Sequence, residues 1–416
     1  MHGSGSSGSS DNEETFERTV RWLLHGDPAI RWQTRRDLLD AAPAEVVAER
    51  ALVATTGWGR TLLDCQDRSG TWACGLYSPK WTSTTYTLLL LRHYGLAPGH
   101  PAALRAVEQI WDGARYFGGG LTSAGSIDAP EACVTSMYLA LARYFRFDDA
   151  RVEVAMDWLL TNQLGDGGWN CRTVRFGDRH SSFHTTILAL EALAEECRRE
   201  PDRRQIDTAL AKGREFLLDH RLYRSHRDGT VVNPAFTHLS FPPRWHYDVL
   251  RGLDHFQNTH APWDDRYQDA LDLVVHRQRS DGTWPVQNKH AGKVWFDMEK
   301  TGGPSRWNTL GHFVSNGGQS GLFRPAPQAA SVRDDRSPRV DERRSQAGPP
   351  RPSSGPLRES VLIIHSWWRL TTAVTEYTDH LSRAGFLAGS ADLSKIVSPR
   401  PKKRPSPCVG LGGRGR

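Results

Sequence analysis

Three copies of one short motif constrain this chain more than any other feature: a Gln, three residues, a Gly, one residue and a Trp. The copies span residues 66–72, 163–169 and 278–284. Each follows an apolar run with helical spacing, and its Gly can supply the left-handed turn that ends such a helix. The Trp is expected to pack back over the turn while the Gln bonds freed backbone groups. Three copies at intervals predict an internal repeat.

The helix that follows each turn opens with Ser, Thr, Asp or Pro, residues that cap or begin helices. Such starts are predicted near residues 28, 82, 132, 183, 245 and 305. Amphipathic segments precede them at residues 14–24, 45–63, 102–116, 152–163, 205–218 and 265–277. Helices that are apolar on both sides belong inside, and helices with one polar face belong outside. The pattern predicts an all-α fold, a six-hairpin α/α toroid (α6/α6 barrel) over residues 13–314, with an open solenoid as the alternative.

Composition divides the 416 residues into one large core and two tails. Residues 1–12 are rich in Gly and Ser and are expected to be flexible. Residues 315–416 are rich in Pro, Arg and Ser and are expected to be largely disordered, although 357–387 could form helices. The absence of a membrane-length apolar run, a signal peptide and a close-set cysteine framework predicts a cytoplasmic protein, with at most peripheral membrane contact. The net charge of +6 is too diffuse to indicate nucleic-acid binding.

In its helix pairs and its Gln–Gly–Trp motifs, the chain resembles the superfamily of squalene–hopene cyclases and protein prenyltransferase β subunits over roughly residues 14–312. The resemblance implies a central cavity for an apolar isoprenoid, lined by the starts of the inner helices. Aromatic faces there could stabilise a carbocation by cation–π attraction. The aromatic residues at these starts are Trp32, Trp81, Tyr86, Phe183, Trp245, Tyr247 and Trp307. The alternative for each is an ordinary place in the core.

The same resemblance implies a zinc site. Prenyltransferase β subunits bind zinc with Asp-x-Cys at one inner-helix start and Tyr-His-Thr at the next, and this chain has Glu131-Ala-Cys133 and Phe183-His184-Thr185. Glu131, Cys133 and His184 would then hold the metal and leave a fourth position open, as catalytic zinc sites do. Without the family pattern, Cys133 is more simply a small buried hydrophobe, and His184 a helix-capping residue.

Four residues could supply acid–base chemistry. Asp128 and Glu131 form a carboxyl pair that could protonate an alkene or epoxide. His246 and Asp248, one repeat further along, could act as a base or position a ligand. Neither family's pattern is complete, because residues 117–130 contain no Lys or Arg for a diphosphate and no Asp-x-Asp-Asp cluster.

These features predict an isoprenoid-handling enzyme of the terpene cyclase or prenyltransferase type, acting on an apolar polyprenyl substrate. One alternative is a carbohydrate-active hydrolase or lyase, which would need paired carboxylates across the cavity, and Glu131 with Asp248 is the best pair available. A non-catalytic toroid that binds a lipid or a protein is the other alternative, and it would explain why both active-site patterns are incomplete.

Overall fold

The computed structural model describes residues 7–201 and 203–315, so the predicted tail from 316 onward, with its possible helices at 357–387, lies outside the described residues. The described part is mostly helical, which confirms the all-α fold. Its strands form two short antiparallel pairs: β1 (Arg115–Phe117) with β2 (Gly120–Thr122), and β3 (Trp284–Pro285) with β4 (Pro304–Ser305). No helix in these two ranges is long and apolar enough to cross a membrane.

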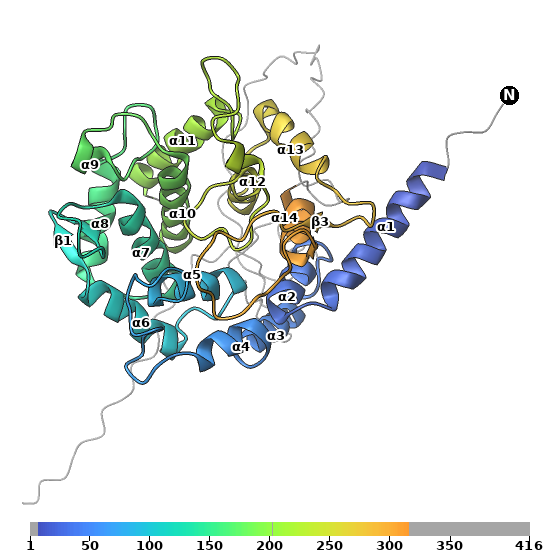
Figure 1. Cartoon of the computed structure of the whole chain (residues 1–416), viewed down its shortest axis with the longest axis horizontal. Helices are drawn as coiled ribbons and strands as arrows, with labels where there is room; N and C mark the ends of the chain where they lie inside the picture. The colour runs from blue at the N-terminus through green and yellow to red at the C-terminus, as the bar shows by residue number, and fades with distance from the viewer. Residues whose placement is uncertain (1–6, 202, 316–416) are drawn as a thin grey trace, which may run out of the picture. The chain divides into compact units, whose positions relative to one another are not determined.

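Six helices of the described chain begin within four residues of the predicted inner starts. They are α2 (Pro28–Asp37), α5 (Thr84–Tyr94), α7 (Ala132–Phe145), α10 (Phe183–Arg199), α12 (Val249–Asn258) and α14 (Arg306–Ser315). Their contacts run in order, from α5 to α7, α10, α12 and α14, and α14 packs on α2 (Figure 1). The indole of Trp32 in α2 then donates a hydrogen bond to the Tyr94 carbonyl at the end of α5, at 2.8 Å. The series of inner-helix contacts therefore closes on itself.

The outer helices are α1 (Ser7–Leu24), α3 (Pro43–Ala51), α4 (Gly57–Asp64), α6 (Pro101–Asp112), α8 (Ala150–Thr161), α11 (Arg204–Asp219) and α13 (Gln268–Val275). Each packs on an inner helix, as α6 does on α5 and α7. The predicted segment 45–63 is divided between α3 and α4 by a 3-10 turn, Leu52–Ala54. Because α1 begins at Ser7, part of the segment predicted to be flexible is helical. A four-residue helix, α9 (Thr173–Phe176), lies in the loop before α10.

The three motif turns share one set of hydrogen bonds. Their tryptophans are fully buried, and each indole donates to a carbonyl ten residues earlier: Trp72 to Leu62 at 2.6 Å, Trp169 to Leu159 at 2.8 Å and Trp284 to Val274 at 2.7 Å. Each Trp backbone N–H donates to a threonine hydroxyl of the next inner helix, which is Thr84, Thr186 or Thr309. Each motif thus ties the end of an outer helix to the start of the next inner helix.

Candidate functional site

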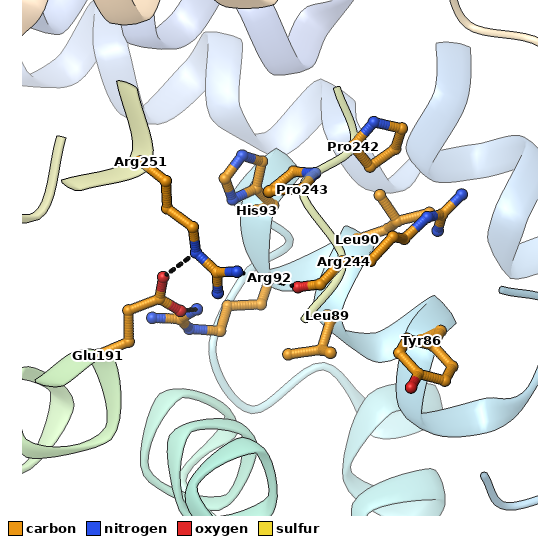
Figure 2. A pocket seen from close by; sticks show the side chains of 10 residues that line it. All are labelled: Tyr86, Leu89, Leu90, Arg92, His93, Glu191, Pro242, Pro243, Arg244 and Arg251. Carbon is orange, nitrogen blue, oxygen red and sulfur yellow. Dashed lines mark hydrogen bonds and ion pairs between the residues drawn. The ribbon is translucent and has the colours of Figure 1, made fainter. Parts of the chain in front are cut away.

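A pocket lies among three inner helices, between α5, α10 and the start of α12 (Figure 2). It holds about 400 Å³ of space between atoms, part of it open to solvent. Its lining consists of Tyr86, Leu89, Leu90, Arg92 and His93 of α5, Glu191 of α10, Arg251 of α12, and Pro242, Pro243 and Arg244 of the loop before α12. Five of these ten residues are Arg, His or Glu, so this polar pocket is less aromatic than the predicted cavity.

Two arginines of the polar pocket are neutralised by carboxylates (Figure 2). Arg251 Nε lies 2.7 Å from a Glu191 oxygen, and Arg92 Nη1 lies 3.4 Å from the other. Arg92 Nη2 also contacts Glu195 at 2.8 Å. Burial disfavours the charged form of Glu191, but the charges of Arg251 and Arg92 outweigh burial and lower the pKa of Glu191 to about 2. Glu191 is therefore ionised at neutral pH and cannot serve as a general acid there.

Arg244 differs from these two arginines. Its side chain is buried, with the residue only 6% exposed, and its Nε and Nη1 atoms have no hydrogen-bond partner among the described residues. The guanidinium lies over the ring of Trp81, 5.3 Å from the ring centroid. Burial lowers the pKa of Arg244 to about 10, so the side chain stays protonated at neutral pH.

A second, aromatic pocket adjoins the polar pocket, and the two share Leu90 and Arg244. The aromatic pocket holds about 210 Å³ of space between atoms, and apart from Arg244 its lining is apolar or aromatic. It is formed by Leu62, Trp81, Leu90, Tyr94, Arg244, Val294, Trp295, Phe296 and Met298. Sequence reasoning missed Trp295 and Phe296, because they lie in the long loop between β3 and β4 and belong to no periodic segment.

Four of the predicted aromatic residues lie at or near the pockets. Trp81 lines the aromatic pocket and Tyr86 lines the polar pocket. Trp307 stacks on His93, a residue of the polar pocket, with ring centroids 4.6 Å apart. Trp245 stacks on His246 at 3.7 Å, and Lys80 lies over both Trp245 and Trp81.

The other three predicted aromatic residues serve the core. Trp32 packs between α2 and α5, where its indole bonds the Tyr94 carbonyl. Phe183 and Tyr247 pack on each other with ring centroids 5.1 Å apart, and the Tyr247 hydroxyl donates to the Leu222 carbonyl at 2.6 Å. Neighbouring helices and loops enclose these three rings and neither pocket includes them, so their cavity-lining role stays a prediction.

The three predicted zinc ligands have separate partners. The Cys133 thiol hydrogen-bonds the thiol of Cys171, which raises the pKa of Cys133 and lowers that of Cys171 to about 7. An oxygen of Glu131 accepts a hydrogen bond from the Thr122 hydroxyl at 2.6 Å. His184 Nδ1 accepts the backbone N–H of Tyr247 at 2.8 Å, which turns the imidazole toward the loop before α12.

A search of residues 7–201 and 203–315 finds no group of three or more His, Cys, Asp or Glu side chains placed to hold a metal ion. Cys133 and His184 interact with different neighbours, Cys171 and the Tyr247 backbone. Zinc binding remains a prediction without support from the contacts.

The predicted acid–base groups have different environments. Asp128 is a surface residue with a side chain 91% exposed, and it pairs with Arg115, so the carboxyl pair with Glu131 is not enclosed in a cavity. Asp248 is buried and caps α12, and its oxygens accept the backbone N–H groups of Arg251 at 2.9 Å and Ser240 at 3.0 Å. Burial raises the pKa of Asp248 to about 6, but Asp248 lines neither pocket.

His246 lies in a stack of rings, between Trp245 and His290, with centroid distances of 3.7 and 3.8 Å. Burial, followed by the charges of His290 and His184, lowers the pKa of His246 to about 3. The imidazole is therefore neutral at physiological pH, in the form a base requires.

Glu131 lines neither pocket but lies near Tyr77, which packs on a residue of the polar pocket. It is partly buried at the start of α7, and its charge contributes to the raised pKa of Tyr77, after burial and the larger effects of Tyr86 and Cys133. The ring of Tyr77 packs on that of Tyr86 with centroids 5.4 Å apart, and Tyr86 lines the pocket.

No family model and no curated protein matches the chain. Among solved structures it is similar to a protein from Actinoplanes, with a TM-score of 0.40 and 16% identity over 74% of this chain and 98% of that one. It is also similar to the type II terpene cyclase MstE from Scytonema, with a TM-score of 0.38 and 14% identity over 74% and 97% of the two chains. A variant of MstE in complex with geranylgeranyl dihydroxybenzoate, its substrate, gives a TM-score of 0.36 and 16% identity over 66% and 81%. Because these scores and identities are low, the case for a function has to come from the chain's own residues.

Proposed function

We propose that the chain is an isoprenoid-handling enzyme of the terpene cyclase type, which binds a polyprenyl compound across the two joined pockets. The observation that carries this proposal is the aromatic pocket formed by Trp81, Trp295 and Phe296, which meets a polar pocket among the inner helices at Arg244. A flexible apolar chain gains free energy when it is buried against such rings, and the polar pocket presents charged side chains to a head group.

The ring of Trp295 suits a cationic intermediate. The ring of Trp81 already attracts a cation, because the Arg244 guanidinium lies 5.3 Å from its centroid, and a second positive charge there would be repelled. A carbocation formed on a bound polyprenyl chain would gain cation–π attraction from Trp295 in the same pocket. The aromatic rings would also keep water away from the cation, which water would otherwise quench.

We assign the role of general acid to Glu131. Of the two carboxyls predicted to protonate an alkene or epoxide, Asp128 is exposed at the surface, whereas Glu131 is partly buried near Tyr77, whose ring packs on the pocket residue Tyr86. In the reaction, the Glu131 carboxyl transfers its proton to an alkene or epoxide, C–C bonds form as the cation is attacked by neighbouring double bonds, and a proton is finally lost to a base. The product is then an isomer of the substrate.

The test is to incubate the full chain with polyprenyl alcohols, acids, epoxides and aryl ethers and to look by mass spectrometry for products of unchanged mass. Removing a general acid typically costs a factor of about 10² to 10⁴ in rate, so Glu131→Gln should nearly abolish such products. Asp128→Asn is the matched control, because it changes an exposed carboxyl three residues away and should leave the rate unchanged.

Two results would overturn the proposal. One is an isomerising activity that Glu131→Gln leaves intact, which would remove the assigned acid. The other is cleavage of an oligosaccharide in a parallel assay without turnover of any polyprenyl compound, which would favour the carbohydrate-active alternative.

The zinc prediction has its own test in the same protein preparations. Elemental analysis should find about one zinc per chain that is lost in Cys133→Ala if the metal-dependent transfer reaction applies. Zinc that is absent, or bound equally by Cys133→Ala, would contradict the predicted ligand set.

A further inference from the structure

Arg244 is a buried cation for which the described residues supply no carboxylate. Arginine side chains are rarely buried deeply unless they are paired, because removing a charge from water is costly. Arg92 and Arg251 in the same pocket follow this rule through Glu191 and Glu195. Arg244 has no ion pair with a described carboxylate, and its Nε and Nη1 atoms have no hydrogen-bond acceptor among the described residues.

The surroundings of Arg244 offset only part of the free-energy cost of burying its charge. The Trp81 face attracts the guanidinium, but a ring accepts no conventional hydrogen bond in the guanidinium plane. The phenols of Tyr86 and Tyr94 lie near enough to affect the pKa of Arg244, yet burial raises the pKa of each phenol, so both stay neutral. The site therefore has unused positive charge and unused N–H donors.

Arg244 lies at the junction of the two pockets, where the polar end of a ligand would be placed. Arg244 is one of two residues that line both the polar and the aromatic pocket, and the other, Leu90, is uncharged. A ligand with its apolar chain against Trp81 and Trp295 would bring its polar end to the junction, where Arg244 lies.

We propose that Arg244 binds an oxyanion, a carboxylate or a phosphate group, carried at the polar end of the ligand. A carboxylate or phosphate oxygen would accept the unpartnered N–H groups and neutralise the buried charge, and charge-assisted bonds of this kind are the stronger ones. The proposal rests on the proposed function only for the apolar chain of the ligand. The anion site itself follows from Arg244.

The experiment compares four probes on the full chain by calorimetric titration. Geranylgeraniol, geranylgeranoic acid and geranylgeranyl diphosphate share one apolar chain and differ in the head group, and inorganic diphosphate has no apolar chain. We expect one or both of the anionic lipids to bind about 10- to 100-fold more tightly than the alcohol. The ranking of the acid against the diphosphate identifies which oxyanion the site prefers.

Variants assign the preference to Arg244. Arg244→Met should reduce the ratio of anion to alcohol affinity to about one, and Arg244→Lys should restore part of the ratio because it keeps the charge. Arg36→Met is the matched control, because Arg36 also lies over a tryptophan, Trp32, but is paired with Asp37 and lines neither pocket. It should leave the ratio unchanged.

The outcomes separate this inference from the proposed function. If the lipids bind but the alcohol binds as tightly as the anions, or Arg244→Met keeps the preference, Arg244 is not the anion site and the proposed function stands. If inorganic diphosphate binds in an Arg244-dependent way while no lipid binds, the anion site is supported and the isoprenoid function fails. If no probe binds, both fail.

Discussion

The motif turns and the polar pocket differ in whether all of their buried polar groups have hydrogen-bond partners. In the turn at Trp169, the indole, the backbone N–H and the side-chain amide of Gln163 all have partners within the fold. In the pocket, Arg244 is buried with two donor atoms unpartnered among the described residues. The turn is therefore complete without a ligand, whereas the pocket is not. Buried polar groups are normally satisfied, so an exception of this kind is a group that a water or a ligand can still satisfy.

The threonines of the inner helices extend this comparison to a unit that lacks the motif. Thr135 in α7 accepts the Leu121 backbone N–H at 3.1 Å, as Thr84 and Thr186 accept the N–H of a motif tryptophan. The same threonine position thus secures the chain before an inner helix even where the tryptophan is missing. The Thr135 contact is structural. Its loss should lower the stability of the fold without a direct effect on catalysis.

The largest loss of stability is expected when a motif tryptophan is removed. Trp169→Ala deletes a fully buried ring and its bond to the Leu159 carbonyl, and truncations of this kind cost about 3–5 kcal/mol. Urea unfolding followed by circular dichroism would measure the loss. Phe176→Ala serves as the control, because its side chain in α9 is exposed and its loss, including the cation–π contacts with Arg172 and Arg175, should cost about 1 kcal/mol or less. Equal effects of the two substitutions would contradict the structural role of the turn.

Glu191→Gln should come next, with a loss of about 3 kcal/mol at neutral pH, because it leaves two largely but not fully buried guanidinium groups with less negative charge between them. The pH dependence gives a second measurement. The pKa of Glu191 is lowered from 4.5 to about 2 in the fold, so its stabilising contribution is complete above about pH 4.5 and is lost as the pH falls toward 2.

Unfolding curves from pH 7 to pH 2.5 should therefore decline less steeply in acid for Glu191→Gln than for the wild type. Glu17→Gln provides the comparison, since Glu17 pairs with Arg21 at the surface and should contribute little at any pH. An unchanged acid slope in Glu191→Gln would show that other carboxylates dominate the acid unfolding.

A smaller effect should distinguish two copies of the motif from each other. The Gln163 amide donates to both the Gly167 and Ala209 carbonyls, at 2.7 and 2.8 Å, whereas the Gln278 amide bonds the Gly282 carbonyl at 3.3 Å. Gln163→Leu should cost about 1–2 kcal/mol and Gln278→Leu about half as much, because fewer and longer bonds are lost. Calorimetric melting of both variants would rank them, and the reverse order would mean that these bonds do not determine the strength of the turn.

The sequence was sufficient for the fold because its signals are local. The start of α2 follows from its cap, Asp27, and the starts of α7 and α10 from apolar periodicity, and all three helices begin at the predicted residue. Each motif also predicts its own turn, since the Gly, the Gln and the Trp act within a few residues of one another.

The site was less predictable because it depends on loops and on side-chain direction. His184 lies at the predicted helix start, but the Tyr247 backbone N–H sets the direction of its ring, and Cys133 turns to Cys171. Arg244 and Trp295 occupy irregular segments before α12 and α14, where no periodicity marks a residue as inward-facing. The available signal for Arg244 was its position between two prolines and Trp245. That signal predicts a binding residue only when the side chain is known to be buried.

The smallest effect on stability is expected for Arg244→Met, and its size decides whether Arg244 differs in kind from its neighbours. Arg92→Met removes a partner of Glu191 and Glu195 and leaves buried carboxylates uncompensated, which costs about 3–5 kcal/mol. Arg244→Met leaves no carboxylate without its counter-charge, because no described carboxylate pairs with Arg244. The substitution also replaces a buried charge with an apolar side chain of similar length. The free energy of unfolding should therefore stay within about 1 kcal/mol of the wild type or rise, since the cost of burying an unpaired charge disappears. Urea unfolding of the two variants side by side makes the comparison. If Arg244→Met lost as much stability as Arg92→Met, Arg244 would be part of the framework, and the difference between the completed turns and the incomplete pocket would disappear.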